Sequence, residues 1–362
     1  MIVLDSHCDT PSQVVRLRDL GRRSRLGHID FPKLREGGVD ACFFALYTSQ
    51  SRPQEEALQY VHKMLSATKE AIAACDYVVQ AYTVADVYSN KAKGLISIFF
   101  GMENGMPIGK SIANLEELFA QGVRYLTLTH NGDNQIADSA SKGTTWNGLS
   151  PFGEEVVARM NQLGMIVDLA HASDKTFYDA LSASETPIVS THSCCRALAS
   201  HRRNLDDKML RALADKGGVI QINFYPAFLD DSFNAAFSAN PLSDEADAVE
   251  EKFIENPADA ARRQAWDAMQ ERLLELPRPS YKRVVDHIDH AVNVAGIEAV
   301  GIGSDFDGIV VPPEGLENAS RIPVLFDELR RRGYSEDAVE KIAGGNFLRV
   351  LSDVEKFASK PL

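Results

Sequence analysis

Four of the nine histidines in the chain belong to short polar motifs that directly follow or end apolar runs. The first motif is His7-Cys8-Asp9. Side chains two residues apart in an extended segment point the same way, so the imidazole and the carboxylate can bind one cation while Cys8 points elsewhere. This ligand pair suits zinc or a similar first-row metal. The alternative is a histidine and an aspartate that bond loop backbone groups.

Three further candidate ligands, Glu103, His171 and His192, end or follow other apolar runs. Taken singly, Glu103 could be a loop carboxylate, and each histidine a hydrogen-bonded core residue. Five candidates are too many for one catalytic zinc, which keeps three protein ligands and an open position. They suit two metals that share a carboxylate. Two ions about 3.5–4 Å apart lower the pKa of a shared water toward about 7, which predicts hydrolysis of an amide or ester.

Eight short segments that are apolar nearly throughout must position these residues. Such segments are typical of parallel strands covered on both faces, and helical patterns follow most of them. Ser111, Ser150-Pro151 and Ser335 are expected to begin three of the helices. The expected strands are Met1–Leu4, Val39–Tyr47, Leu95–Phe100, Arg124–Thr129, Met165–Leu169, Pro187–Thr191, Val219–Phe224 and Ala299–Gly303.

This alternation predicts an α/β fold, a (β/α)₈ TIM-like barrel, with its active site at the carboxyl ends of the strands. An open doubly wound sheet is the alternative, but no G-x-G-x-x-G follows the first strand. We expect one catalytic domain over residues 1–362. Residues 229–276, with twelve acidic and four basic side chains, form a predicted helical insertion between strands seven and eight, over the barrel mouth or in a dimer interface.

The overall charge limits the partners of the protein. The chain has 362 residues, with 38 Lys and Arg against 51 Asp and Glu, and a net charge of −13. Such a chain repels nucleic acid and anionic membranes, and no apolar run approaches the roughly 18 residues of a membrane span. The five cysteines show no CxxC spacing, and the first residues lack the basic region of a secretory signal. We therefore expect reduced thiols and a cytoplasmic location.

Some remaining polar residues receive ordinary interpretations. His287 and His290 fall in a helical run and are expected at the surface. Asp307 precedes Gly308, so we expect it to form a turn.

The order and spacing of the motifs resemble the renal (membrane) dipeptidase family of binuclear zinc metallopeptidases, in a bacterial soluble form. The resemblance extends from the first strand to Asn346-Phe347. It implies a (β/α)₈ barrel of the metallo-dependent hydrolase type that hydrolyses free dipeptides, including some with a D-configured C-terminal residue. The motifs are His7-x-Asp9, Gly101-Met102-Glu103-Asn104, Tyr125-Leu126-Thr127-Leu128-Thr129-His130-Asn131, His192-Ser193, Arg202-Arg203-Asn204 and Gly303-Ser304-Asp305-Phe306-Asp307-Gly308.

The resemblance also implies two Zn²⁺ ions per chain and assigns their ligands. His7 and Asp9 would bind one zinc, Glu103 would bridge both ions, and His171 and His192 would bind the second.

The same resemblance assigns three residues to the substrate. His130 would contact the scissile carbonyl oxygen, and Arg203 would bind the free carboxylate of the dipeptide. Asp305 would move a proton from the shared water to the leaving amine. These roles match a guanidinium fork and a carboxylate beside metals.

Two departures from the family concern substrate choice. Residues 131–135 lack the tryptophan of animal relatives, and those relatives lack the acidic insertion. Another binuclear amidohydrolase, acting on N-acyl amino acids or lactones, is the alternative enzyme. A non-catalytic relative that only binds peptides is the alternative of another class. Small dipeptides are the expected partners, and a homodimer is possible.

Overall fold

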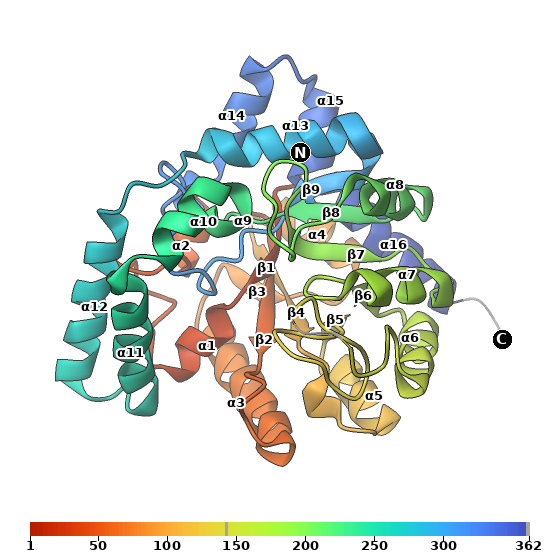
Figure 1. Ribbon diagram of the computed structural model, residues 1–362, viewed down its shortest axis with the longest axis horizontal. Helices are drawn as coiled ribbons and strands as arrows, with labels where there is room; N and C mark the ends of the chain where they lie inside the picture. The colour runs from red at the N-terminus through yellow and green to blue at the C-terminus, as the bar shows by residue number, and fades with distance from the viewer. Residues whose placement is uncertain (142–143, 360–362) are drawn as a thin grey trace.

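In a computed structural model that describes residues 1–141 and 144–359, eight parallel strands form a nearly closed barrel (Figure 1). This confirms the predicted fold class. The strand order around the barrel is β1-β2-β4-β5-β6-β7-β8-β9, and the short β3 pairs with the first residues of β4. The strands are β1 (Leu4–Cys8), β2 (Ala41–Tyr47), β3 (Val78–Gln80), β4 (Ile96–Glu103), β5 (Val123–Thr127), β6 (Ile166–Asp168), β7 (Val189–Ser193), β8 (Val219–Ile222) and β9 (Val300–Ile302).

The first strand differs from its prediction. It covers Leu4–Cys8 and not Met1–Leu4, so His7 lies inside the strand and not after it. The polar residues that argued against a strand are satisfied within the barrel. Asp5, for example, accepts hydrogen bonds from the backbone N–H groups of His7 and Ser304. The sequence analysis also missed β3, which has only three residues.

The last strand reaches the first through the segment that follows β9. Phe306 pairs with Cys8, the Asp9 N–H donates to the Phe306 carbonyl over 2.8 Å, and the Asp305 N–H donates to the His7 carbonyl over 3.0 Å. This closure places the His7-x-Asp9 motif directly beside Asp305.

Helices surround the barrel in Figure 1, and side-chain caps begin many of them. Ser111, Ser150 and Ser335 accept hydrogen bonds from the first turns of α5, α6 and α15, as predicted. The helices outside the 229–276 segment are α1 (Thr10–Val15), α2 (Phe31–Glu36), α3 (Gln54–Ala73), α4 (Val84–Ala92), α5 (Ile112–Ala120), α6 (Pro151–Leu163), α7 (Asp174–Ala183), α8 (Asp207–Asp215), α9 (Pro226–Leu229), α13 (Tyr281–Ala295), α14 (Pro323–Arg331), α15 (Glu336–Glu340) and α16 (Asn346–Ala358).

Aromatic side chains fill the barrel interior toward the amino-terminal ends of the strands. Phe43 stacks on Phe99 with ring centroids 4.7 Å apart and lies 5.3 Å from Tyr125. Phe347 of α16 packs edge-on against Phe43 at 5.1 Å and closes the amino-terminal end of the barrel. This apolar layer is the floor on which the polar residues at the strand ends rest.

Residues 229–276 contain three helices, α10 (Asp231–Ser238), α11 (Pro241–Glu255) and α12 (Ala260–Leu274). Helices α11 and α12 lie side by side at the left edge of Figure 1 and share a small core around Phe253, Trp266 and Met269. Arg16, which follows α1, forms an ion pair with Glu250 of α11 at 3.0 Å. The segment therefore packs beside the carboxyl end of β1. Within the described residues, no helix combines the length and the apolar character that a bilayer crossing requires.

Candidate metal centre and active site

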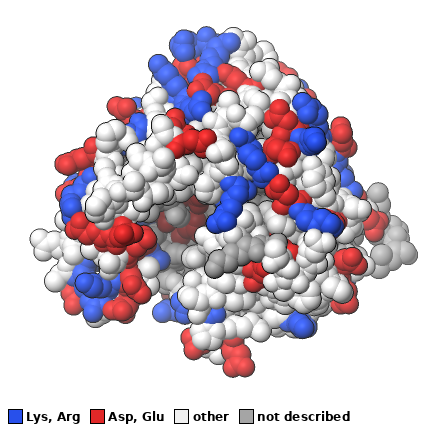
Figure 2. Space-filling model, in the orientation of Figure 1, with Lys and Arg blue, Asp and Glu red and all other residues white. Residues whose placement is uncertain are grey.

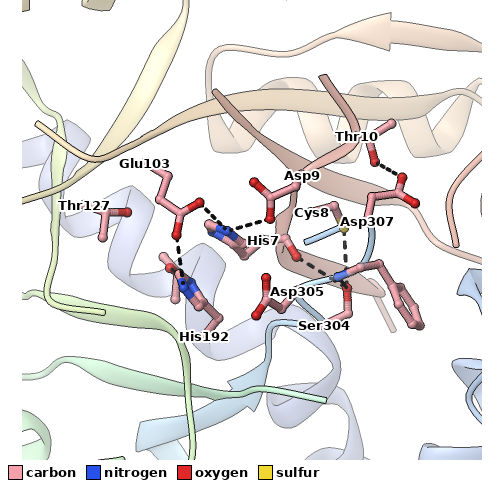
Figure 3. A network of polar contacts seen from close by, with 12 residues as sticks. His7, Cys8, Asp9, Thr10, Glu103, Thr127, His192, Ser304, Asp305 and Asp307 are labelled. Atoms are coloured by element: carbon pink, nitrogen blue, oxygen red, sulfur yellow. Dashed lines mark hydrogen bonds and ion pairs between the residues drawn. The ribbon is translucent and has the colours of Figure 1, made fainter. Parts of the chain in front are cut away.

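Three of the predicted ligands meet at the carboxyl ends of β1 and β4 (Figure 3). His7 Nε2 lies 3.5 Å from Asp9 Oδ2 and 3.5 Å from Glu103 Oε2, and all three side chains are buried. Cys8 lies on the other side of the strand, where its Sγ is 3.2 Å from Asp5 Oδ2 and 3.4 Å from Cys42 Sγ. The two-residue spacing therefore directs His7 and Asp9 toward one point, as predicted.

His171 and His192 face the same carboxylate from β6 and β7. Their Nε2 atoms lie 3.0 Å and 3.4 Å from Glu103 Oε1, and only 3.0 Å from one another. The other ring nitrogen of each histidine has its own acceptor. His171 Nδ1 lies 3.1 Å from Asn131 Oδ1, and His192 Nδ1 lies 2.9 Å from Thr191 Oγ1.

These second hydrogen bonds indicate which nitrogens carry protons. Thr191 donates its own proton to Asp168 over 2.7 Å, so its oxygen accepts from His192 Nδ1–H. With both Nδ1 atoms protonated, two Nε2 lone pairs face each other at 3.0 Å. Lone pairs at that distance repel each other unless a cation lies against them.

The buried polar atoms support the same conclusion. His7 Nε2 and Asp9 Oδ1 are buried without a hydrogen-bond partner. Around Glu103 and Asp9, three groups of side chains each have ligand atoms that lie within 4.8 Å of one another: His7 with Glu103 and His192, Glu103 with His130 and His171, and His7 with Asp9 and Asp305. Imidazole nitrogens and carboxylate oxygens are the ligands that catalytic zinc prefers, so these residues fit metal ions. His130 and Asp305 join two of the sets, although the sequence analysis did not propose them as ligands.

Burial and mutual charge set the protonation of the cluster. Burial alone would lower the pKa of His7, but the carboxylates of Glu103 and Asp9 outweigh it and hold that pKa well above its usual range. Burial lowers the pKa of both His171 and His192 well below the usual range. Against the effect of its own burial, the surrounding histidines keep the pKa of Glu103 well below normal. Glu103 is therefore an ionised carboxylate among imidazoles.

Tyr125 joins the apolar floor to the candidate centre. Its hydroxyl lies 2.8 Å from His7 Nδ1, the nitrogen that points away from Glu103. With a proton on Nδ1, His7 would donate to Tyr125, and a metal ion that displaced the Nε2 proton would bind the lone pair at Nε2. Gly101 makes room for the tyrosine, because a Cβ at Gly101 would lie 2.0 Å from the ring.

Gly308 makes room for two carboxylates in the same way. A Cβ at Gly308 would lie 2.1 Å from Asp9 Oδ2 and 2.6 Å from Asp305 Oδ1. The preceding residue, Asp307, has a positive φ of 67° and accepts hydrogen bonds from Arg18, at 2.6 Å, and from Thr10, at 2.9 Å. Its turn conformation is as predicted, and its carboxylate also holds the β9 loop against α1.

Asp305 lies at the edge of the cluster. Burial, aided by the charge of Glu103, raises the pKa of Asp305 to about 6, although His7 and a hydrogen bond from Asn223 pull it down. Asn223 Nδ2 donates to Asp305 Oδ2 over 2.9 Å. A carboxylate with this pKa can accept and release a proton near neutral pH.

A cavity of about 480 Å³ opens over these groups, and Asp9, Glu103, His130, His171 and Asp305 contribute to its lining. Figure 2 shows the hollow near the middle of the face, with acidic atoms visible inside it. The ring of His130 lies 4.2 Å from His171 and 4.7 Å from Tyr47, and burial lowers its pKa. A neutral His130 can donate a hydrogen bond into the cavity.

Arg203 is buried near His192. Its Nη2 donates to the His192 carbonyl over 3.3 Å, and its guanidinium carbon lies 5.3 Å above the ring of Phe228, which lines the cavity. Its Nε is buried without a partner, and burial lowers its pKa to about 10, so it stays charged. Within the described part of the chain, no carboxylate forms an ion pair with it.

Two residues that contact the cluster were not predicted from the sequence. A third residue, away from the cluster, was predicted at the surface and is buried. Asn223 immediately follows β8, so the strand-end rule that selected the histidines would also have found it. Tyr125 lies within an apolar strand, and although it begins one of the family motifs, the sequence assigned it no role. His287, predicted at the surface, is buried, because its Nδ1 accepts from the Cys195 N–H and its Nε2 lies 3.0 Å from the Leu229 carbonyl.

Several known proteins with similar sequences and structures are named as dipeptidases. The family model for membrane dipeptidases, peptidase family M19, matches residues 1–361. "Dipeptidase aclJ" of Aspergillus oryzae is 35% identical over 348 residues, covering 92% of this chain and 71% of that protein. The crystal structure of the probable dipeptidase PvdM from Pseudomonas aeruginosa has a TM-score of 0.81 at 28% identity, over 99% and 96% of the two chains. The structure of "dipeptidase AC", an M19 metallopeptidase, has a TM-score of 0.78 at 25% identity, over 99% of each chain.

The hydrogen bond between Tyr125 and His7 provides a test of the metal centre. Tyr125→Phe keeps the ring and removes the Nδ1 partner, so we expect the affinity for Zn²⁺ to fall about 10- to 100-fold. Titration against a competing chelator measures this. Tyr88→Phe, at an exposed side chain, is the control and should leave the affinity unchanged. Equal affinities for the two variants would show that Tyr125 does not orient a metal ligand.

Proposed function

The chain belongs to the membrane dipeptidase family, and from its site we propose that it is a two-zinc enzyme that hydrolyses free dipeptides, including those with a D-configured C-terminal residue. Membership makes the protein a peptide hydrolase of the M19 metallopeptidases. One observation supports the full proposal best: a buried Arg203, which forms no ion pair with any described carboxylate, lies beside a cluster of buried imidazoles and carboxylates. The extension to D-residues follows from the family resemblance.

We assign the metal ligands as the sequence predicted. His7 and Asp9 would hold one ion, His171 and His192 the other, and Glu103 both, since it is the carboxylate with an oxygen toward each histidine group. Two zinc ions held there would polarise the scissile carbonyl and lower the pKa of a water shared between them.

Three residues would act on the dipeptide itself. Arg203 would bind the C-terminal carboxylate through its guanidinium fork, which fixes the peptide bond relative to Glu103. His130, kept neutral by burial, would donate to the scissile carbonyl oxygen. Asp305 would accept the proton of the attacking water at its carboxylate and deliver it to the leaving amine, a role that suits a pKa of about 6.

We further propose that residues 1–362 act as one catalytic barrel domain, with residues 229–276 as an insertion at its mouth. Cytoplasmic action is also part of the proposal, supported by the free thiols of all five cysteines. The alternative, an amidohydrolase that acts on N-acyl amino acids or lactones, differs from a dipeptidase in what it requires of its substrate. Such an enzyme does not need the free ammonium group of its substrate.

Activity and metal content test the central proposal together. Protein loaded with zinc should contain two ions per chain by elemental analysis and should cleave free dipeptides with L- or D-configured second residues. N-acetylation of the same dipeptides should abolish cleavage. Glu103→Gln should lose metal and activity together, because one substitution affects both ions.

Two outcomes would contradict this assignment. A fully active preparation with at most one metal ion per chain would contradict the assignment of Glu103 as a ligand shared by two ions. Faster cleavage of the N-acetylated substrates would favour the amidohydrolase.

Arg203→Ala tests recognition of the carboxylate. A charged hydrogen bond in a partly desolvated site contributes about 1.5–3 kcal/mol, so kcat/KM for a free dipeptide should fall by about one to two orders of magnitude. Amidation of the dipeptide's C-terminus should cost the wild type a similar factor and the variant much less. Arg202→Ala is the matched control, because Arg202 is exposed and bonds the Ser141 carbonyl. Equal losses on amidation in wild type and Arg203→Ala would refute the role of Arg203.

Removal of the hydrogen bond from Asn223 tests the proton-transfer role of Asp305. It stabilises the ionised carboxylate, so Asn223→Ala should raise the pKa of Asp305. Because the unprotonated carboxylate is the active form, the acidic limb of kcat/KM should move to higher pH, by about one pH unit. A full pH–rate profile with metal content held constant measures the shift. An unmoved acidic limb would exclude Asp305 as the titrating group.

A further inference from the structure

The cavity over the candidate centre has a cationic side that the mechanism above does not use. Arg16 and Arg52 are the two basic side chains among the residues that line it. Arg16 follows α1, and Arg52 lies in the loop between β2 and α3. Both are therefore at the mouth of the barrel, on the side of β1 and β2.

The two arginines differ in how their charge is compensated. Arg16 Nη1 pairs with Glu250 of α11 at 3.0 Å, so its charge is balanced by the 229–276 segment. Arg52 instead stacks on Tyr60, with its guanidinium carbon 4.0 Å from the ring centroid. Among the described residues no carboxylate pairs with Arg52, and its Nε is buried without a hydrogen-bond partner.

Stacking of this kind leaves the edge of the guanidinium free. The N–H groups of arginine lie in the plane of the group, so an aromatic ring against its face does not satisfy them. Arg52 thus offers a positioned cationic fork inside a concave site, and none of the carboxylates that line this site forms an ion pair with it.

The strand order places Arg52 opposite Arg203. Arg52 follows β2 and Arg203 follows β7, and these strands are four apart in a barrel of eight. A dipeptide whose carboxylate binds Arg203, with its peptide bond over Glu103, extends its N-terminal residue toward the β1 and β2 side. This step rests on the proposed function.

We propose that Arg52 recognises a carboxylate on the side chain of the N-terminal residue, so that the preferred substrates are dipeptides beginning with Asp or Glu. A guanidinium fork binds a carboxylate with two parallel hydrogen bonds, which a neutral amide cannot match. The same charge disfavours N-terminal Lys or Arg. Glu250 limits this preference for acidic residues, because its ion pair with Arg16 cancels the charge of that second arginine.

The test compares four dipeptides that differ in the N-terminal residue: Glu-Ala, Gln-Ala, Ala-Ala and Lys-Ala. Each is prepared with L-Ala and with D-Ala. For the zinc-loaded wild type, kcat/KM for Glu-Ala should exceed that for Gln-Ala about tenfold, and Lys-Ala should be the slowest. Arg52→Gln should bring the Glu-Ala to Gln-Ala ratio close to one. Arg35→Gln is the matched control. Arg35 stacks on Tyr77 at 3.4 Å in the same manner and does not line the cavity, so the ratio should stay at the wild-type value.

A second variant tests the charge balance without altering Arg52. Glu250→Gln frees the charge of Arg16, so the Glu-Ala to Gln-Ala ratio should rise about threefold or more above wild type. A wild-type ratio near one, or a ratio that Arg52→Gln leaves unchanged, would overturn the assignment while dipeptidase activity stands. Failure to cleave any of the four dipeptides would overturn the proposed function, and this inference with it.

Discussion

The candidate centre depends on how the protein compensates a buried carboxylate. Glu103 is 3% exposed, and nitrogens of three imidazoles lie within 3.0–3.5 Å of its oxygens. An ionised carboxylate removed from water is very costly unless opposite charge or hydrogen bonds surround it. Imidazoles from β1, β6 and β7 can reach Glu103 of β4 because a barrel directs the carboxyl ends of its strands toward one mouth. The centre therefore requires the barrel.

The surroundings of the cluster restrict each imidazole to one orientation. Tyr125, Asn131 and Thr191 each contact the ring nitrogen that faces away from Glu103. The backbone contributes as well, because Asn104, His171, Asp305 and Asp307 are four of the six non-glycine residues with positive φ in the described chain. Asn, Asp and His tolerate this conformation better than most residues, and held conformations of this kind cluster at functional sites. Polar residue types are thus suited both to the chemistry and to the turns that present it.

Much of this arrangement could be predicted because the signals were local. Apolar runs predicted the parallel strands, and polar residues at their ends predicted His7, Asp9, Glu103, His171 and His192, which the structure brings together. Features that depend on tertiary contacts could not be predicted. The first strand was misplaced because Asp5 has buried partners elsewhere in the chain, and His287 is buried through bonds to Cys195 and Leu229. The tyrosine that supports His7 lies in an apolar strand, where an aromatic residue indicates only packing.

Chemistry and substrate choice belong to different parts of the molecule. Most of the residues around Glu103 lie on strands or directly after them, where the packed barrel fixes their positions. Arg52 and Arg16 lie in the connections beyond the strands. Glu250 belongs to a helical segment whose small apolar core, completed by Val311, is separate from the core of the barrel. Loops carried on a rigid scaffold can change without disturbing it. Because Glu250 reaches the cavity from that separate core, a change in residues 229–276 can alter the charge at the mouth while the strands that hold Glu103 and its imidazoles stay in place.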